Sequence, residues 1–429
     1  MMFLFLVPLW LSAASSDLKA DHFHFDGKVA HLEGNIALNH PLGQISSDFA
    51  DLILDPAKTK GPFSKLFLRG QVYIKRQSTQ LKCTEAFIDC LKEEGKFTSS
   101  SKVELIHLVK EKELFIKSKE AIVKYEKDHI REAVAKGLVE VNWDQIGAKG
   151  PELFLKQMEG NDYEVILKPD AFLVLGNEHE LHGDSIRATT KNESATVENP
   201  KGTLKKGELD VEADELLWQN DSLTLTGHVK IRLESKGVLT TDGPVIIHRD
   251  KNKEWDTAQI ENESTFIRND GEKSFTLIAS KGMQADLKNR RIVFESIPGK
   301  PVHMLDDMGE AFGDKLTLVY VNKELDKVIL EGDVYLSHVL NSEVERSYAK
   351  GDRLIYEPKI YETVLESDRG RVFIFDRVNQ LEVSAPRIRM KRDPVTRKET
   401  VRGEGDVRFH LLDKEFKELK DRFKFEGEK

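Results

Sequence analysis

Two pairs of histidines are the residues of this chain whose spacing first suggests chemistry. The segment HELH at 179–182 places two imidazoles three residues apart, and His22 and His24 lie two apart. Imidazole is a common zinc ligand, but side chains three apart on a strand point to opposite faces, and the helical spacing HExxH is absent. We interpret His179 and His182 as exposed loop residues, and His22 and His24 as solvated residues near the terminus. We expect no metal and no other cofactor.

The motifs of common catalytic sites are also absent from the sequence. There is no GxSxG nucleophile segment, no phosphate-binding loop and no dinucleotide fingerprint. Asp306 and Asp307 are adjacent carboxylates, but adjacency carries little weight among 74 acidic residues. We therefore expect a protein that is not an enzyme. A polysaccharide lyase or hydrolase built on a β-helix remains an alternative, which would need converging carboxylates in a cleft.

The two cysteines, Cys83 and Cys90, lie seven positions apart. On one extended strand this separation exceeds about 20 Å at about 3.3 Å per residue, so a disulfide would require a sharp corner between them. The odd spacing also places their side chains on opposite faces of a strand. We expect two half-buried thiols.

Charge limits the class of partner. The chain of 429 residues carries a formal net charge of −9, and 32% of its residues are charged against 39% hydrophobic. Binding of nucleic acid requires a basic surface that neutralises phosphates, so we expect no nucleic-acid partner. The basic run 386–398 could meet lipid phosphates, but its cations alternate with Ile388 and Met390, which is typical of the solvated face of a hairpin.

The elements that would position a site come from a repeated pattern, apolar-x-Gly-x-[Val/Ile]-x, closed by another apolar residue. Its copies are LEGNIAL (32–38), LRGQVYI (68–74), AKGLVEV (135–141), LTGHVKI (225–231), LEGDVYL (330–336) and, with a leading glycine, GEGDVRF (403–409). Repetition of this kind indicates stacked copies of one small β unit that share a core. A glycine within a strand marks a bulge, a corner or a close approach of two backbones.

A second pattern follows the copies and leads from small and polar residues into an apolar strand. Clear examples are SSDFADLIL (46–54) and SYAKGDRLIY (347–356). Apolar and polar residues alternate in both patterns, as in strands with one buried face. We therefore predict an all-β fold of stacked strand repeats. Most intervals between the repeat glycines lie near multiples of about 35 residues, but the step of 90 residues between Gly137 and Gly227 does not. The polar stretch 188–208 within this step indicates either a junction between two modules or a long loop.

The apolar residues beside each glycine would stack into columns that face the core. They are Ile36, Leu38, Val72, Ile74, Val139, Val141, Val229, Ile231, Val334, Leu336, Val407 and Phe409. Each such side chain contributes about 1.5–3 kcal/mol when fully buried. Two facing sheets can either fill the space between them with these columns or leave an apolar slot that accepts acyl chains, and periodicity does not separate the two arrangements.

The N-terminus has a different composition. The apolar run from Met2 to Leu11 is too short to cross a bilayer, which takes about 20 residues. With Ser12 and Ala14 before the cleavage point it fits a signal peptide over residues 1–14, and hence export. No Lys or Arg precedes the run, and a buried strand or an uncleaved anchor is the alternative.

The C-terminal tail is the one segment with a helical period. One stripe of a helix contains Leu412, Phe416, Leu419 and Phe423. This short helix would either cap the last strand or dock a partner.

The two strand patterns together resemble the OstA-like (LptA-type) proteins of lipopolysaccharide transport. The best matches are LEGNIAL with SSDFADLIL and LEGDVYL with YAKGDRLIY, and the likeness covers most of residues 25–410. The resemblance implies an elongated, taco-like β-jellyroll that holds the acyl chains of lipid A between its sheets and performs no catalysis. The columns beside the glycines would then line the lipid slot. This chain is longer than a single-jellyroll member of the family.

The resemblance also implies an organisation and a location. Residues 20–195 and 205–411 would form two OstA-like modules, and 412–429 a helical cap or tail. The protein would lie in the periplasm, bind lipopolysaccharide, and bridge the inner and outer membranes by pairing its free strand edges with other transport components. Head-to-tail self-association would use the same edges. The alternative is a structural or surface β-solenoid with a filled core.

Overall fold

Strands make up most of the described chain, which confirms the predicted all-β class. The computed structural model describes residues 17–411 except 41, 58–61, 127–128, 177, 234–236, 253, 270–273, 307–308, 323, 340–345, 369, 377–380, 394 and 397–398. The predicted signal peptide and C-terminal helix lie outside the described residues, as does Asp307. Within them, the only helix is the 3₁₀ turn η1 (Pro358–Ile360). The chain divides into two compact units, Met1–Lys206 and Gly207–Lys429.

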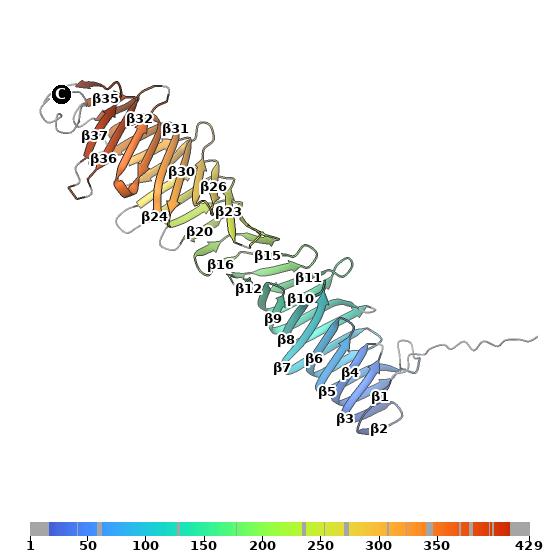
Figure 1. Ribbon diagram of the computed structural model, residues 1–429. Coiled ribbons are helices and arrows are strands. Elements are labelled where there is room, and N and C mark those ends of the chain that lie inside the picture. Colours follow the sequence, from blue (N-terminus) through green and yellow to red (C-terminus); the bar gives the residue numbers. More distant parts are fainter. Residues whose placement is uncertain are drawn as a thin grey trace, which may run out of the picture. The chain divides into compact units, whose positions relative to one another are not determined.

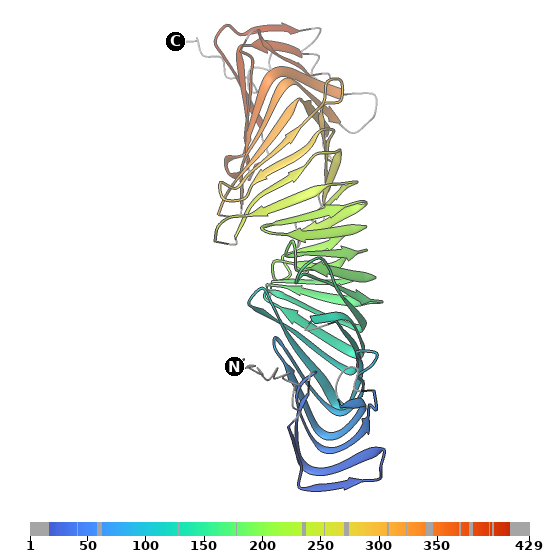
Figure 2. The same cartoon turned by 90° about the vertical axis from the view of Figure 1, so that its right-hand side faces the viewer.

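Long antiparallel strands that pair in chain order form most of the first unit (Figure 1). They are β3 (Val29–His40), β4 (Gly43–Leu54), β5 (Phe63–Arg76), β6 (Thr79–Asp89), β7 (Glu94–Val109), β8 (Lys112–Glu126), β9 (His129–Trp143) and β10 (Ile146–Gln157). The register between neighbours shifts near the middle of each strand, for example between Glu33 and Ile36 of β3. The strands bend there, so each contributes to two facing sheets (Figure 2).

We call these two sheets sheet 1 and sheet 2. Each long strand contributes one half to each sheet. Sheet 1 is the sheet that contains residues 36–40 of β3, and sheet 2 is the sheet that contains residues 29–33. Beyond β10 each sheet continues with separate short strands. Sheet 1 adds β12 (Ala171–Leu175), β13 (His179–Gly183) and β16 (Lys201–Leu204). Sheet 2 adds β11 (Tyr163–Lys168), β14 (Ser185–Thr189) and β15 (Ser194–Glu198).

The opposite edge of the first unit is formed by two short strands that both pair with β3. These are β1 (Leu18–Lys19), which extends sheet 1, and β2 (His22–Phe25), which extends sheet 2. At the other end, the polar stretch 188–208 holds β15 and β16, so it is not the long loop that was one of its two interpretations. Its polar residues occupy the outward positions of short strands, and Ala195, Val197 and Leu204 supply the buried ones.

The second unit also consists of two sheets, which we call sheet 3 and sheet 4. Sheet 3 contains β17 (Leu209–Glu212), β20 (Val229–Leu233), β21 (Gly237–Thr241), β24 (Ser264–Asn269), β25 (Ser274–Ala279), β28 (Val302–Asp306) and β29 (Gly309–Gly313). Sheet 4 contains β18 (Glu215–Gln219), β19 (Ser222–Thr226), β22 (Val245–Arg249), β23 (Trp255–Ile260), β26 (Gly282–Asp286), β27 (Arg291–Glu295) and β30 (Lys315–Val321).

Two long strands, β31 (Glu324–Val339) and β32 (Arg346–Glu357), run through both sheets of this unit. After them sheet 3 ends with β34 (Val372–Asp376), β35 (Leu381–Ala385) and β38 (Arg408–Leu411). Sheet 4 ends with β33 (Glu362–Glu366), β36 (Arg387–Arg392) and β37 (Glu399–Glu404). The core of this unit lies between the two sheets and includes Leu316, Leu330, Val334 and Val372.

The repeat glycines lie at the corners between sheets, which confirms their predicted role. Gly34, Gly70, Gly137, Gly227, Gly332 and Gly405 all have φ between 69° and 96°. At Gly70 the space that a Cβ would need is filled by the side chain of Asp48, whose Oδ2 accepts a hydrogen bond from the backbone N–H of Gln71 at 3.0 Å. In LTGHVKI the corner is sharper, and it separates β19 from β20 instead of bending one strand.

Candidate functional site

The candidate site is the apolar interior between the two sheets of each unit. The residues predicted to line it from the first unit are all buried, and Ile36, for example, is 2% exposed. They are Ile36, Leu38, Val72, Ile74, Val139 and Val141. All six belong to the sheet 1 halves of their strands. Sheet 2 presents Leu52, Leu66, Leu68 and Leu153 to the same interior.

The second unit buries only part of its predicted set. Val229, Ile231 and Val334 are buried, whereas Leu336 and Val407 are half-buried against the core. Phe409 is 47% exposed, although it pairs with the buried Val383. Phe409 lies on β38, the last strand of sheet 3 in the part of the chain that the structure describes, so no further described rung covers it.

The interior of the first unit is closed along the side opposite the corners by contacts between side chains. We call this line of contacts the seam. His40 on sheet 1 packs against Phe63 on sheet 2 with ring centroids 6.2 Å apart, and the guanidinium of Arg76 lies 5.8 Å from the ring of Tyr125. Backbone therefore connects the two sheets through the corners, while side chains connect them at the seam.

The most polar part of the seam lies near β7 and β11. His107 Nε2 is 3.0 Å from Tyr163 Oη, and His107 Nδ1 is 2.8 Å from Thr79 Oγ1. Lys110, in the turn after β7, forms an ion pair with Asp162 at 2.9 Å and donates a hydrogen bond to the carbonyl of Thr190 at 3.0 Å. The two sheets are thus joined here by a buried hydrogen-bonded pair and a more exposed ion pair.

Burial decides the charge states inside this unit. It lowers the pKa of His107 from 6.5 to about 4, and it raises the pKa of Tyr163 to about 12. Burial, with the Arg76 charge nearby, also lowers the pKa of His40 to about 4. All three groups are neutral at pH 7, so the interior of the first unit presents hydrogen-bonding groups but no net charge at these positions.

Cys83 and Cys90 are free thiols, and both are buried. The expectation that they face opposite sides of a strand is wrong, and so is the expectation of half-burial. The register of β6 shifts between Lys82 and Glu85, and this bulge reverses the alternation so that both thiols point inward. Burial raises the pKa of each thiol to about 12.

The histidines of HELH lie on strand β13, not in an exposed loop as predicted. His182 is exposed, but His179 is buried, and its Nδ1 accepts a hydrogen bond from the backbone N–H of Lys205 at 3.0 Å. His22 and His24 are exposed on β2, as expected. Among the described residues no group of three or more His, Cys, Asp or Glu side chains is placed to hold a metal ion.

The basic run 386–398 forms a hairpin of β36 and β37 where the structure describes it, as predicted. Ile388 is buried, and the neighbouring Arg389 forms ion pairs with Glu362 and Glu404. Arg387 and Arg389 are thus engaged with carboxylates of sheet 4. As for membranes, none of the described helices has the length and apolar character of a membrane span.

No family model matches the chain, and no curated protein matches it. One similar solved structure is the crystal structure of LptH, the LptA-homologous periplasmic component of the lipopolysaccharide transport device of Pseudomonas aeruginosa. It shares 14% sequence identity, covers 33% of this chain and 95% of its own, and has a TM-score of 0.26. A similarity at this level defines neither a family nor a function.

Proposed function

We propose that this chain is a non-catalytic lipid-binding protein of the periplasm that shields the acyl chains of lipopolysaccharide between the inner and outer membranes. The observation that carries the proposal is the continuous apolar interior of each unit. In the first unit side chains alone close this interior along the seam. Burial of an acyl chain there would gain about 0.8 kcal/mol per methylene. The sugars and phosphates of the lipid would stay outside in water.

Lipid would enter by separating the sheets at the seam. The columns at Ile36, Val72 and Val139 are packed in the lipid-free chain, so an acyl chain would replace side-chain contacts between sheet 1 and sheet 2. The corners would act as hinges, because the backbone runs through them. The seam contacts would break, and those at the surface, such as Lys110 with Asp162, cost little to separate.

Membrane bridging would use the free strand edges. The outer edge of β2 has no partner strand in the described part of the chain, and Phe23 and Phe25 are exposed on it. Such an edge can accept a strand of another transport component or of a second copy. Placing aspartate at Phe23 and Phe25 should lower association with these partners in pull-down and light-scattering experiments without unfolding the first unit.

A second candidate function is that of a structural β-solenoid, which the dense packing of the columns favours. A photo-crosslinking amino acid at Val229 or Val334, with Lys230 as the outward control, separates the two in cells. Capture of lipopolysaccharide from the inward positions but not from Lys230 supports the transport proposal. Capture from Lys230 alone, or from none, supports the structural one. The mass of the captured lipid also tests whether the protein is non-catalytic. A mass that corresponds to a cleaved lipid would contradict this part of the proposal.

A further inference from the structure

The outer face of sheet 3 carries a row of aromatic side chains that the lipid proposal does not use. We call it the outer aromatic row, and it consists of His303, Phe312, Tyr335, Tyr348, Phe373 and Phe375. These residues come from β28, β29, β31, β32 and β34, which are adjacent in the sheet. Four steps between neighbouring strands make a row about 19 Å long.

The rings of the row contact one another from strand to strand. His303 stacks on Phe312 with centroids 4.3 Å apart, and Tyr348 lies 6.2 Å from Tyr335 and 5.3 Å from Phe375. Tyr335 is 39% exposed. Among the described residues neither tyrosine hydroxyl has a hydrogen-bond partner, so both can donate to and accept from a ligand.

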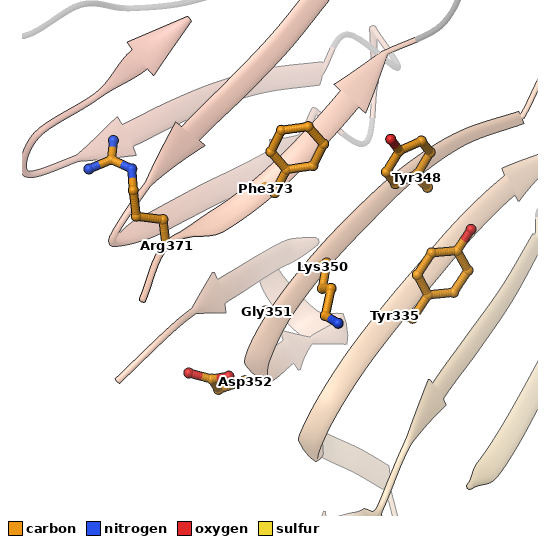
Figure 3. Close-up of a pocket in the computed structure, with 7 residues that line it drawn as sticks. All are labelled: Tyr335, Tyr348, Lys350, Gly351, Asp352, Arg371 and Phe373. Carbon is orange, nitrogen blue, oxygen red and sulfur yellow. The ribbon is translucent and has the colours of Figure 1, made fainter. Parts of the chain in front are cut away.

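A pocket of about 210 Å³ opens within the row (Figure 3). Its lining includes Tyr335, Tyr348 and Phe373, with Lys350 between Tyr335 and Phe373 and Arg371 at the edge. A site for a whole drug-sized ligand encloses about 300–1,000 Å³, so this pocket would take a single ring of a longer molecule. The row continues on one side of it, with Phe312 and His303, for the neighbouring rings.

The charges around the pocket balance. Lys350 pairs with Asp333 at 2.9 Å, and Arg371 pairs with Asp406 at 3.0 Å. Asp352 accepts a hydrogen bond from the hydroxyl of Ser367 at 2.6 Å. Arg408 also pairs with Asp406, at 2.9 Å. Three cations and three carboxylates leave no excess positive charge, so the site does not favour phosphorylated or carboxylated ligands. The ligand that fits is uncharged, has flat apolar faces, and carries hydroxyls.

We infer that the outer aromatic row binds a neutral oligosaccharide. A pyranose ring has an apolar C–H face that packs on an aromatic ring, and hydroxyls at its edge that bond to tyrosine and charged side chains. Successive sugars of one chain would lie along successive strands, with one sugar in the pocket. This site is on the outer face, so it does not depend on whether the interior takes lipid.

Native affinity electrophoresis of the purified full chain tests this inference. The gels contain dextran, amylose, galactomannan or hydroxyethyl cellulose, with alginate as the charged comparison. We expect at least one neutral polysaccharide to slow the migration of the protein. Alginate should not be the only polysaccharide that does so. Tyr348→Ala and Phe373→Ala should each weaken binding roughly threefold to tenfold, the effect expected for one aromatic contact. Phe67→Ala, which removes an exposed ring that packs on Phe87 of the first unit, should change nothing.

Tyr348→Phe keeps the ring, and it should retain most of the binding even if Tyr348→Ala disturbs the sheet. Failure of all four neutral gels to retard the wild type would overturn the inference. Retardation by alginate alone would also overturn it. The same holds if the neutral gels retard the wild type and the three variants equally, namely Tyr348→Phe, Tyr348→Ala and Phe373→Ala. In each of these three cases the row would serve only to stabilise the sheet through cross-strand aromatic pairs.

Discussion

His107 and Tyr163 lie on opposite sheets of the first unit, and their side chains meet across its interior, with Nε2 3.0 Å from Oη. Both residues are buried, and they are separated by 56 positions in the sequence. A neutral imidazole can donate from one nitrogen and accept at the other, so His107 links Tyr163 to Thr79 in one buried chain of hydrogen bonds. This chain holds the seam closed.

The seam should weaken in acid. The unfolded chain protonates His107 below about pH 6.5, whereas the folded chain does so only below about pH 4. The unfolded state therefore binds more protons in this window, and the free energy of unfolding falls as the pH drops from 6.5 to 4, by on the order of 3 kcal/mol at most. Hydrogen exchange of β7 and β11 peptides, corrected for intrinsic rates, measures the loss.

The variant His107→Gln supplies the control for this pH dependence. Glutamine cannot titrate, so the variant should be less stable at pH 7 but should lose less stability on acidification. His40, whose pKa is also about 4, leaves a residual dependence of the same sign. An identical pH dependence in the wild type and in His107→Gln would show that another group is responsible.

The columns, the corners and the strand pairs could be predicted from the sequence because they follow a local period. The seam could not, since no spacing relates His107 to Tyr163 or Lys110 to Asp162 before the sheets are folded together. An irregular register caused the error at Cys83 and Cys90, because the shift between Lys82 and Glu85 breaks the alternation of β6 and changes which face the later side chains occupy. The exposure of Phe409 follows from its place on the last strand that the structure describes in sheet 3, and the periodicity of the sequence does not predict this place.

Leu138→Asn should stabilise the protein. Leu138 follows the corner glycine Gly137, has φ of 52°, and is 73% exposed, so its side chain contributes little packing in a strained backbone conformation. Asparagine tolerates this conformation better, and the equivalent position after Gly34 is Asn35. We expect a gain of about 0.5–1 kcal/mol, measured by thermal unfolding. Leu108→Asn, at an exposed strand position, should give no gain.

Gly70→Ala should destabilise the first unit more than Gly160→Ala. Both glycines have positive φ, at 96° and 72°, so alanine is strained at each. Only at Gly70 would the new Cβ also collide with the Asp48 side chain. The extra cost should be about 1–3 kcal/mol, by analogy with overpacking of other close-packed sites. Equal melting temperatures for the two variants would mean that Asp48 moves aside freely.

The two cysteines should be unreactive in the native protein. Burial shields Cys83 and Cys90 and raises the pKa of each thiol to about 12, so almost no thiolate is present at pH 8. Titration with a chromogenic disulfide reagent should detect no thiol in native buffer and two in guanidinium chloride. Rapid reaction of either thiol under native conditions would indicate that β6 opens readily.

Acyl chains should enter the first unit only when sheet 1 and sheet 2 separate at the seam, and a clamp across the seam tests this most directly. A photo-crosslinking residue at Val141, which is buried near the seam, is compared with one at the exposed Asn142 in the full chain incubated with lipopolysaccharide. Lys110→Cys and Asp162→Cys are added so that a short bismaleimide can clamp the seam, and monofunctional maleimide on the same cysteines serves as the unclamped control. We predict capture at Val141 in the control, a severalfold lower yield after clamping, and no capture at Asn142. Equal capture with and without the clamp, or no capture at Val141, would show that acyl chains do not enter between sheet 1 and sheet 2 at the seam.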